Sequence, residues 1–511
     1  MIRRIASTSL ALALLAAPAG ADPTALYAEH CAACHGAGRL GGTGPALIPE
    51  SLGRMRGPAL ETVIGQGRAA TQMPGFGETL SGEQVAALSA WLLTPLAEVP
   101  AWGAAEIAAS LVPNPDYRAA AAPVFTADPM NITLVVETGD HHVSVLDGDS
   151  FDTLDRFPTP FAVHGGPKFS PDGRFVYVMS RDGWVQKYDI WSLSEVGRVR
   201  AGLNSRNIAI SHDGRWLAVA NYLPMTLTIL DAADLSVAKI VSVAGKGGTP
   251  SRVSAVYQAP PRRSFILALK DIPEVWEVFY GPDAPYQGFV HDHRIEGPPQ
   301  IAQSFPIRRI TLDEPLDDFF FDRDYEHLMG ASREGQGGQV IDLVIGRKIA
   351  DLDLPGMPHL GSGITWPHGA TTLMATPHLK DAAISIIDME TWATVKRLET
   401  LGPGFFMRSH PNSRYAWADV FFGPHRDVMH VIDKERLEIV ASLRPEPGAT
   451  VAHTEFTRDG RHALVSIWED DGAVIVYDAE TLEEVRRLPM RKPSGKYNVW
   501  NKITFSDGTS H

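Results

Sequence analysis

An aspartate that recurs at intervals of 42 to 46 residues is the feature that most constrains the fold of this 511-residue chain. Each time, an apolar strand ends on the aspartate, at positions 147, 189, 231, 342, 388, 433 and 478. A period of roughly 40–50 residues with several short strands is typical of a β-propeller, whose sheets bury their faces only against one another. The single interval of 111 residues fits two repeats, one without its aspartate. The pattern therefore predicts eight blades.

A second repeated element is a turn followed by a strand, in "SPDGRFVYVMS" (170–180), "SHDGRWLAVAN" (211–221), "HPNSRYAWADV" (410–420) and "TRDGRHALVSI" (457–467). The strands alternate apolar and polar residues, and Gly or Pro stands at the turns, which favours strands over helices. We expect the propeller to occupy residues 121–511. We also expect residues 123–136 to add to the last blade and close the ring.

The first 21 residues have the pattern of a secretory signal peptide. Arg3 and Arg4 precede an apolar run that is too short to span a bilayer, and Ala19-Gly20-Ala21 forms a cleavage site of small residues. The mature chain is therefore predicted to begin near Asp22 and to lie in the periplasm, without a membrane span. The net charge of −14 argues against nucleic acid as a partner.

The stretch "CAACH" (31–35) holds both cysteines of the chain. C-x-x-C-H is the attachment sequence of c-type haem, in which Cys31 and Cys34 bind the porphyrin covalently and His35 binds the iron. The alternative is a disulfide or a redox C-x-x-C site, but no βαβ pattern surrounds the motif. The sequence therefore predicts one covalent haem c.

A class I cytochrome c domain is expected over residues 22–98, followed by a linker at 99–120. Met73, in the loop "TQMPGFG", is predicted as the sixth iron ligand, with Met55 as the competitor. Ser81 and Gln84 form a capping box at the start of a closing helix, which Pro95 ends. The fold class is thus an α-helical cytochrome c domain followed by an all-β propeller.

Three histidines lie close to turns at the starts of blades: His164, His359 and His453. Residues that enter the innermost strand of a blade line the mouth of the propeller channel, so three imidazoles could face one cavity. A single such histidine is more often a hydrogen-bonded core residue. The repeated position within the blade favours a shared site.

The chain resembles the cytochrome cd1 nitrite reductase family, whose propeller holds haem d1. The resemblance rests on the domain order and on "FAVHGGPKFSPDGRFVYVMSRDGWVQKYDIW", "NSRNIAIS" and "SRVSAV". It implies His164 as the proximal iron ligand of haem d1. It also implies that Arg206 and Arg252 bind carboxylates of the macrocycle, with Arg181 and Lys270 as further candidates.

The departures from the nitrite reductase pattern are informative. Of the two distal histidines of the reductases, this chain keeps His359 and has Asp317 in place of the other. It adds His453 and Tyr497, where the reductase pattern has neither. This combination is similar to the dihydro-haem d1 dehydrogenases of the same family, which convert a propionate side chain to an acrylate in the last step of haem d1 biosynthesis.

This resemblance implies a catalytic set of His453, Tyr497 and His359. His453 would be the base, and Tyr497 would assist through a hydrogen bond or as a second proton acceptor. His359 would be the opposite axial ligand of the iron or would act in catalysis. Electrons would pass through haem c to a soluble periplasmic acceptor. The product, haem d1, could be delivered to a cytochrome cd1 nitrite reductase.

Two other functions remain open at this stage. A nitrite reductase could use Asp317 as proton donor if burial raised its pKa. A haem d1 carrier or maturation partner of the reductase would need neither His453 nor Tyr497, and its cytochrome domain would then be unexplained.

Overall fold

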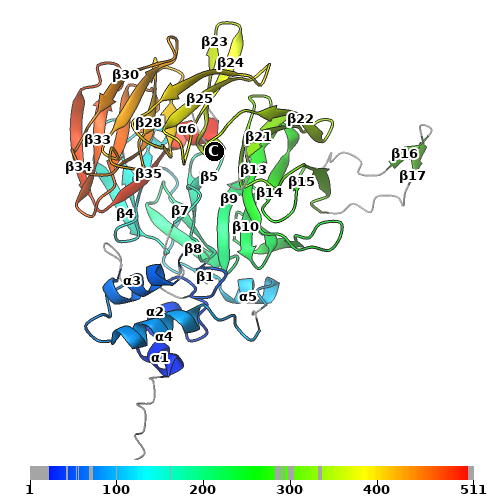
Figure 1. Ribbon diagram of the computed structural model, residues 1–511, viewed down its shortest axis with the longest axis vertical. Coiled ribbons are helices and arrows are strands. Elements are labelled where there is room, and N and C mark those ends of the chain that lie inside the picture. The colour runs from blue at the N-terminus through cyan, green and yellow to red at the C-terminus, as the bar shows by residue number, and fades with distance from the viewer. Residues whose placement is uncertain are drawn as a thin grey trace, which may run out of the picture.

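The computed structural model describes residues 22–504, except 42–43, 53–54, 56, 68–72, 99–100, 161–162, 282–288, 292–293, 297–303 and 332–336. The predicted signal peptide lies outside these residues. Figure 1 shows a small helical unit at one end of a larger ring of β-sheets.

The helical unit is formed by α1 (Pro23–His30), α2 (Ala32–His35), α3 (Pro58–Gln66) and α4 (Gly82–Leu92). The predicted capping box is confirmed, because Ser81 Oγ accepts from the Gln84 backbone N–H and the Gln84 side chain accepts from the Ser81 N–H. Leu88 and Leu92 of α4 are buried against residues of α1 and α3. These contacts form the core of the cytochrome unit.

In the described part of the chain, eight antiparallel sheets of four or more strands form the ring, which confirms the predicted eight blades. From the inner to the outer strand, the first three sheets in chain order are β5 (Lys168–Phe169), β6 (Phe175–Met179), β7 (Trp184–Asp189), β8 (Ser194–Arg200); β9 (Asn204–Ile210), β10 (Trp216–Leu223), β11 (Thr226–Asp231), β12 (Val237–Ser242); and β13 (Val253–Ala259), β14 (Ser264–Leu269), β15 (Glu274–Phe279), β18 (Ile307–Thr311). The next three are β19 (Asp318–Phe321), β20 (His327–Ala331), β21 (Gly338–Asp342), β22 (Arg347–Leu352); β23 (Ile364–His368), β24 (Thr371–Pro377), β25 (Ala383–Asp388), β26 (Thr394–Glu399); and β27 (Met407–Ser409), β28 (Tyr415–Asp419), β29 (Met429–Asp433), β30 (Glu438–Leu443). The last two are β31 (Val451–Phe456), β32 (His462–Ile467), β33 (Gly472–Asp478), β34 (Glu484–Met490); and β35 (Pro493–Asn498), β2 (Thr133–Glu137), β3 (His142–Leu146), β4 (Thr153–Pro158).

The ring closes differently from the prediction. Residues 123–136 do not extend the last sheet, since β31–β34 come from one continuous segment. Instead, β2–β4 lack an inner strand, and the C-terminal strand β35 supplies it by pairing with β2. The chain thus enters the ring at the second strand of a blade and fills the inner position last. Helix α6 (Val499–Thr504) follows β35 directly, and the single-turn helix η1 (Pro129–Asn131) precedes β2.

The repeated aspartates end the third strand of their blades, and turn chemistry explains why they recur. The carboxylate of Asp388 accepts the N–H groups of Glu390 and Thr391 at 2.9 and 2.8 Å, and so closes the turn to the fourth strand. Asp433 makes the same contacts two and three residues ahead. In the blade without the aspartate, β15 ends at Phe279 instead.

The expected linker and the segment between β15 and β18 contain regular structure. Helix α5 (Ala104–Ala109) and strand β1 (Val112–Pro113) lie within 99–120, and β1 pairs with β8 at the edge of a blade. Strands β16 (Phe289–His291) and β17 (Arg294–Glu296) form a hairpin outside the ring, which Figure 1 shows standing away from the body. Two further single-turn helices are η2 (Pro260–Arg262) and η3 (Leu360–Ser362).

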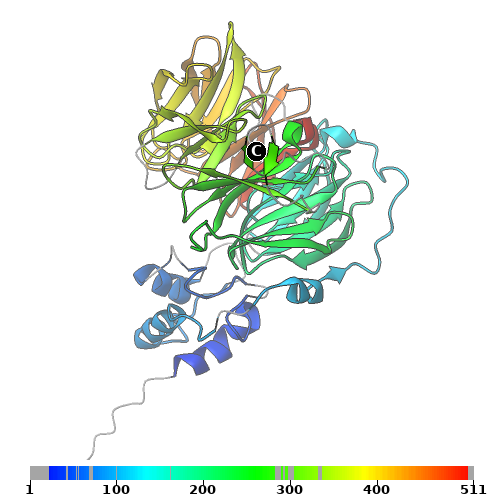
Figure 2. The same ribbon diagram turned by 90° about the vertical axis from the view of Figure 1, so that its right-hand side faces the viewer.

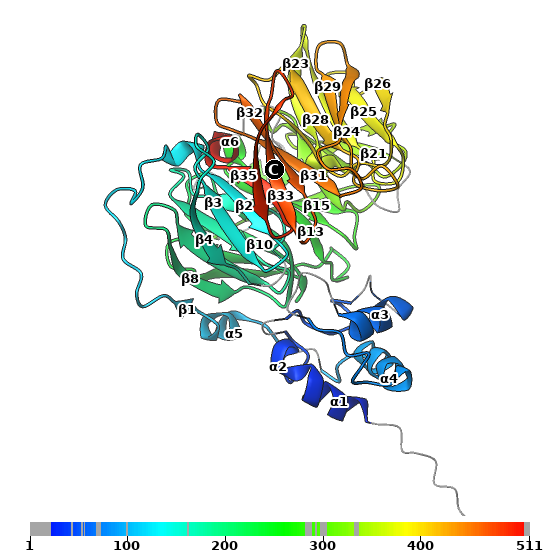
Figure 3. The same ribbon diagram turned by 90° about the vertical axis from the view of Figure 1, so that its left-hand side faces the viewer.

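The cytochrome unit packs against the ring near the starts of the inner strands. Arg200 donates from Nη2 to the carbonyl of Leu40 at 2.6 Å, and the Ala46 N–H donates to Asp182 Oδ1 at 3.3 Å. Figures 2 and 3 show the blue helices against one side of the ring. The apolar part of this interface is made by a cluster that includes Ala46, Ile48, Leu203 and Leu223. Among the described residues, no helix is both long and apolar enough to cross a bilayer.

Candidate functional site

The haem c motif has the geometry that attachment requires. Cys31 follows α1, Cys34 lies in α2, and neither is in a disulfide. His35 is buried, and its Nδ1 lies 2.7 Å from the carbonyl of Pro45. A carbonyl only accepts, so Nδ1 carries the proton and Nε2 is left with the lone pair that binds iron. Burial lowers the pKa of His35, which favours the neutral ligand form.

The ring of His35 is packed tightly against backbone. A Cβ at Gly44 would lie 2.7 Å from its Cε1 atom, so a residue with a side chain would displace the imidazole. Met55 packs against the apolar core of the cytochrome unit, whereas Met73 is half-buried in the loop before α4. Met73 as the sixth ligand therefore stays a prediction.

His164 lies four residues before the start of the inner strand β5, close to the start of a blade as the pattern predicted. Its Nδ1 is 2.6 Å from the carbonyl of Arg206, which again leaves the lone pair on Nε2. Two guanidinium groups contact this nitrogen: Arg206 Nη1 at 2.6 Å and Arg181 Nη2 at 3.0 Å. His164, Arg181 and Arg206 thus form one cluster at the channel.

His359 lies before η3, at the entrance to the inner strand β23. Its Nδ1 is 2.7 Å from the carbonyl of Phe405, so this ring also carries its proton on Nδ1. The ring centroid lies 4.3 Å from that of Phe405. The imidazole is therefore fixed in orientation by a hydrogen bond and by aromatic packing.

His453 differs from the other three histidines in backbone and in tautomer. It lies in β31 at an interruption of the register with β32, with φ of +50°. Its Nδ1 faces the N–H of Lys496 at 3.4 Å, and a backbone N–H only donates, so the proton of the neutral ring is on Nε2. Burial and nearby cations lower the pKa of His453 well below its usual value.

Tyr497 connects His453 to the His164 loop. Its ring centroid lies 5.6 Å from that of His453, and a Cβ at Gly166 would lie 2.8 Å from its Cε1. Burial raises the pKa of Tyr497 to about 12. Phe406 packs between His453 and His359, with ring centroid distances of 5.0 and 6.2 Å. The structure thus links His359, His453 and Tyr497 through aromatic contacts and brings Tyr497 against the loop of His164.

Two other predicted cations are held in ion pairs. Arg252, before β13, forms a bidentate pair with Asp271 at 2.5 to 3.1 Å. Lys270 pairs with Asp317, the residue that replaces a distal histidine of the reductases. Asp317 therefore neutralises a lysine at the channel.

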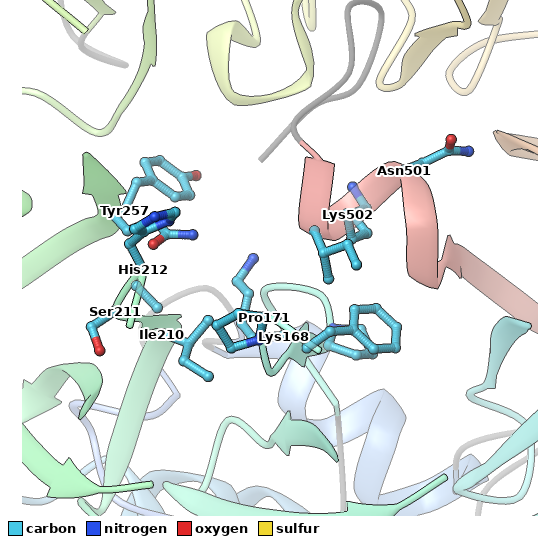
Figure 4. Close-up of a pocket in the computed structure, with 13 residues that line it drawn as sticks. Lys168, Pro171, Ile210, Ser211, His212, Tyr257, Asn501 and Lys502 are labelled. Carbon is cyan, nitrogen blue, oxygen red and sulfur yellow. The ribbon is translucent and has the colours of Figure 1, made fainter. Parts of the chain in front are cut away.

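Sequence reasoning missed a group of residues deeper in the channel. A cavity of about 170 Å³ lies between β5, β9, β13 and α6 (Figure 4). Lys168 and Lys502 line it, together with Tyr257, which donates to Asp318 at 2.8 Å. Arg408 and Glu455 form a buried ion pair at 2.8 Å on the neighbouring inner strands. The place of Lys168, four residues after His164 on an inner strand, was the signal available in the sequence.

Comparisons with known proteins define the class of this molecule. Residues 127–295 and 299–502 match the family described as "Cytochrome D1 heme domain". Residues 18–92 match "Cytochrome C oxidase, cbb3-type, subunit III". Together with the haem c motif and the histidine-lined channel, these matches define a c-type cytochrome joined to a haem d1 propeller.

One relative is similar over the full length. The dihydro-haem d1 dehydrogenase of Pseudomonas aeruginosa is 52% identical over 503 residues, 98% of each chain. The solved structure of dihydro-haem d1 dehydrogenase NirN in complex with DHE has a TM-score of 0.87 at 51% identity, covering 94% of this chain and 100% of that one. A nitrite reductase of Stutzerimonas stutzeri is 24% identical over 534 residues, 94% of this chain and 92% of its own. The chain belongs to the dihydro-haem d1 dehydrogenase family.

Proposed function

We propose that this protein is a periplasmic dihydro-haem d1 dehydrogenase that oxidises one propionate side chain of dihydro-haem d1 to an acrylate. The observation that carries the proposal is the pair of His453 and Tyr497 beside two histidines of iron-ligand type. The 52% identity with the Pseudomonas aeruginosa dehydrogenase supports it. The contrast with 24% identity to a nitrite reductase favours the dehydrogenase over the reductase.

The reaction converts –CH₂–CH₂–COO⁻ to –CH=CH–COO⁻ and releases two protons and two electrons. Haem c would accept the electrons one at a time. It would be held by Cys31, Cys34 and His35, with Met73 as the proposed sixth ligand. We assign a soluble periplasmic one-electron carrier as the final acceptor. A cytochrome cd1 nitrite reductase would be the recipient of the product.

His164 and His359 are proposed to bind the iron of the substrate from opposite faces. Both rings donate from Nδ1 to a backbone carbonyl, which leaves an unprotonated Nε2 for the metal. With both axial positions filled, the iron would have no open site for a small molecule. Chemistry at the rim of the macrocycle, rather than at the metal, is the consequence.

His453 is proposed as the base. Its lowered pKa keeps the ring neutral at pH 7, as a base requires. The contact between its Nδ1 and the Lys496 N–H is long, at 3.4 Å, so exchange to the tautomer with a free Nε2 loses only a weak hydrogen bond.

Tyr497 is proposed to assist as a hydrogen-bond donor. With a pKa of about 12, the phenol keeps its proton at neutral pH, which favours donation over the role of second proton acceptor. Negative charge that builds up on the propionate during deprotonation would be stabilised by this donor.

Arg181 and Arg206 are proposed to bind carboxylates of the macrocycle in bidentate fashion. Both guanidinium groups donate to His164 Nε2, so they would leave that nitrogen when it binds iron and would turn to the carboxylates of the macrocycle beside it. Arg252 and Lys270 are weaker candidates for binding the carboxylates than Arg181 and Arg206. They would have to break their ion pairs with Asp271 and Asp317 first.

A carrier function is the second candidate, and turnover separates it from the dehydrogenase. The test is anaerobic incubation of the holoprotein with dihydro-haem d1, followed by extraction and mass measurement. We expect a loss of two hydrogens with wild type and none with His453→Ala, although His453→Ala still binds the substrate. An unchanged mass with wild type, in the presence of a one-electron oxidant, would contradict the dehydrogenase and favour the carrier.

A further inference from the structure

The cavity next to the catalytic pair contains two lysines that the mechanism above does not use. Lys168 comes from the inner strand β5, and Lys502 comes from α6, the last helix of the described chain. Figure 4 shows both side chains projecting into the space between Tyr257 and α6. Two segments that are more than three hundred residues apart in sequence thus bring two amines to one cavity.

The cavity adjoins the proposed reaction centre. Lys502 Nζ lies 5.4 Å from the ring centroid of Tyr497. The charge of Lys502 is also among the causes that lower the pKa of His453, which shows that the two side chains are close enough to interact. A group bound at Lys502 would therefore lie close to Tyr497, whose ring centroid is 5.6 Å from that of His453.

We propose that Lys168 and Lys502 bind the carboxylate of the propionate side chain that is oxidised. The proposal rests on the proposed function and names the residues that recognise the reacting group. An ammonium pair is the natural partner for a carboxylate, and the α-carbon is directly bonded to that carboxylate. Holding the carboxylate at Lys502 would bring the α-hydrogen towards His453 and keep it there during the reaction.

The charges around the cavity agree with an anionic ligand. Burial lowers the pKa of Lys168 to about 8, with the neighbouring Arg408 as a second cause, and lowers the pKa of Lys502 as well. Asp318 and Glu455 act in the opposite direction, and the phenol of Tyr257 is held by Asp318. A bound carboxylate would stabilise both ammonium groups.

Binding of the carboxylate would also assist the chemistry. Removal of the α-proton moves negative charge into the carboxylate oxygens. A cation beside them therefore stabilises the transition state more than the ground state. Lys502 would then act on the rate as well as on binding. Lys168, on the far side of the cavity, would act mainly on binding.

The test uses Lys502→Gln and Lys168→Gln in the holoprotein. Binding of dihydro-haem d1 is followed by its visible absorption without an electron acceptor, and turnover is measured with one. We expect Lys502→Gln to lower kcat by roughly 100-fold, about the loss on removing one charge-stabilising donor, and Lys168→Gln to weaken binding about tenfold, the effect of roughly 1.4 kcal/mol. Lys348→Gln, on the outer strand β22, is the matched control and should match wild type.

Rescue distinguishes a missing charge from a misfolded helix. Lys502→Cys, treated with bromoethylamine, regains an ammonium group at nearly the same position. We expect it to recover at least a tenth of wild-type kcat, and Lys502→Arg to recover part. Equal weakening of binding by both lysine variants with unchanged kcat would overturn the proposal, because the lysines would then hold a carboxylate that does not react. If wild type gives no mass change but Lys502→Gln still binds dihydro-haem d1 more weakly, the proposed function fails while the carboxylate site stands.

Discussion

At the scale of single residues, proton position separates four histidines of the two predicted haem sites into two kinds. His35, His164 and His359 each donate from Nδ1 to a backbone carbonyl at 2.6 to 2.7 Å. His453 instead accepts at Nδ1 from a backbone N–H. Because a carbonyl cannot donate and an amide N–H cannot accept, the backbone decides which nitrogen of each ring is available to a metal.

Replacement of His164 by Ala is expected to convert the six-coordinate spectrum of bound dihydro-haem d1 to a five-coordinate one, because His359 would be the one axial ligand that remains. His359→Ala should convert a six-coordinate spectrum to a five-coordinate one, since only one axial ligand would remain. His453→Ala should leave the spectrum unchanged. Absorption or resonance Raman spectra of the three loaded variants check this, and a changed ligation state in His453→Ala would argue against its assignment as the base.

Tyr497→Phe is expected to keep substrate affinity and to lower kcat by roughly 100-fold, because one hydrogen-bond donor to a developing anion is removed. A pH profile adds a second readout. The pKa of Tyr497 is raised to about 12, so wild-type kcat should not fall through phenol ionisation below about pH 11. A wild-type alkaline limb near pH 9 that disappears in Tyr497→Phe would contradict this interpretation.

The sequence predicted those site residues that lie in short recognisable motifs. It did not predict residues whose role depends on contacts between distant segments of the chain. His164, His359, His453 and Tyr497 could be proposed because short motifs and a family resemblance marked them. Lys502 was missed because its importance depends on α6 lying across the channel from β5, which no local pattern records. The pairing of Lys270 with Asp317 was missed for the same reason, since Lys270 follows the second strand of one blade and Asp317 precedes the first strand of the next.

At the scale of secondary structure elements, one aspartate at the end of β28 organises two parts of the site. Asp419 accepts the N–H groups of Phe405 and Phe406 through Oδ1 and that of His453 through Oδ2, at 2.8 to 3.0 Å. The carbonyl of Phe405 in turn orients His359. The left-handed backbone of His453 breaks the ladder between β31 and β32, and Asp419 satisfies the N–H left unpaired there.

Asp419→Asn is expected to destabilise the fold by about 2 kcal/mol, because an amide has a single acceptor oxygen for three N–H groups. It should also lower kcat, since the backbone of His453 loses its anchor. Asp433→Asn, which removes the turn-closing carboxylate of β29, is the comparison. We expect it to lower Tm and leave kcat unchanged. Equal kcat in both variants, measured at a temperature where both are folded, would show that Asp419 has no role in positioning.

The repeat of strands was the part of the fold most accessible from sequence. The aspartate of each third strand closes a turn through contacts within three residues, so its spacing directly reports the blade length. The manner of ring closure was not accessible. Whether 123–136 or β35 fills the vacant strand position depends on pairing between the two ends of the chain.

At the scale of the whole molecule, the cytochrome unit lies against the same end of the ring as His164. Ala46, eleven residues after His35, contacts Asp182, and the adjacent Arg181 contacts His164. Burial raises the pKa of Asp182 to about 7 at this interface. The segment that follows the C-x-x-C-H motif and the loop of His164 are thus joined through a short series of contacts.

Leu203→Asp is expected to loosen this interface, because Leu203 is fully buried between the two units. Reduction of haem c by bound substrate should slow at least tenfold, while binding of dihydro-haem d1 stays unchanged. Stopped-flow absorbance of haem c measures the rate. Val485→Asp, at an exposed position of the outer strand β34, is the control. Identical rates in wild type and Leu203→Asp would contradict electron transfer across this interface.

The closure of the ring by β35 has a consequence for when the enzyme becomes competent. Tyr497 and Lys502 belong to the last twenty residues of the chain. A chain in which β35 and α6 have not yet docked contains the proposed carboxylate-binding arginines and the proposed iron-binding histidines but lacks these two groups at the site. In such a chain the ring is still open, and the proposed catalytic tyrosine is absent from the site. A substrate molecule bound at that stage would not be oxidised.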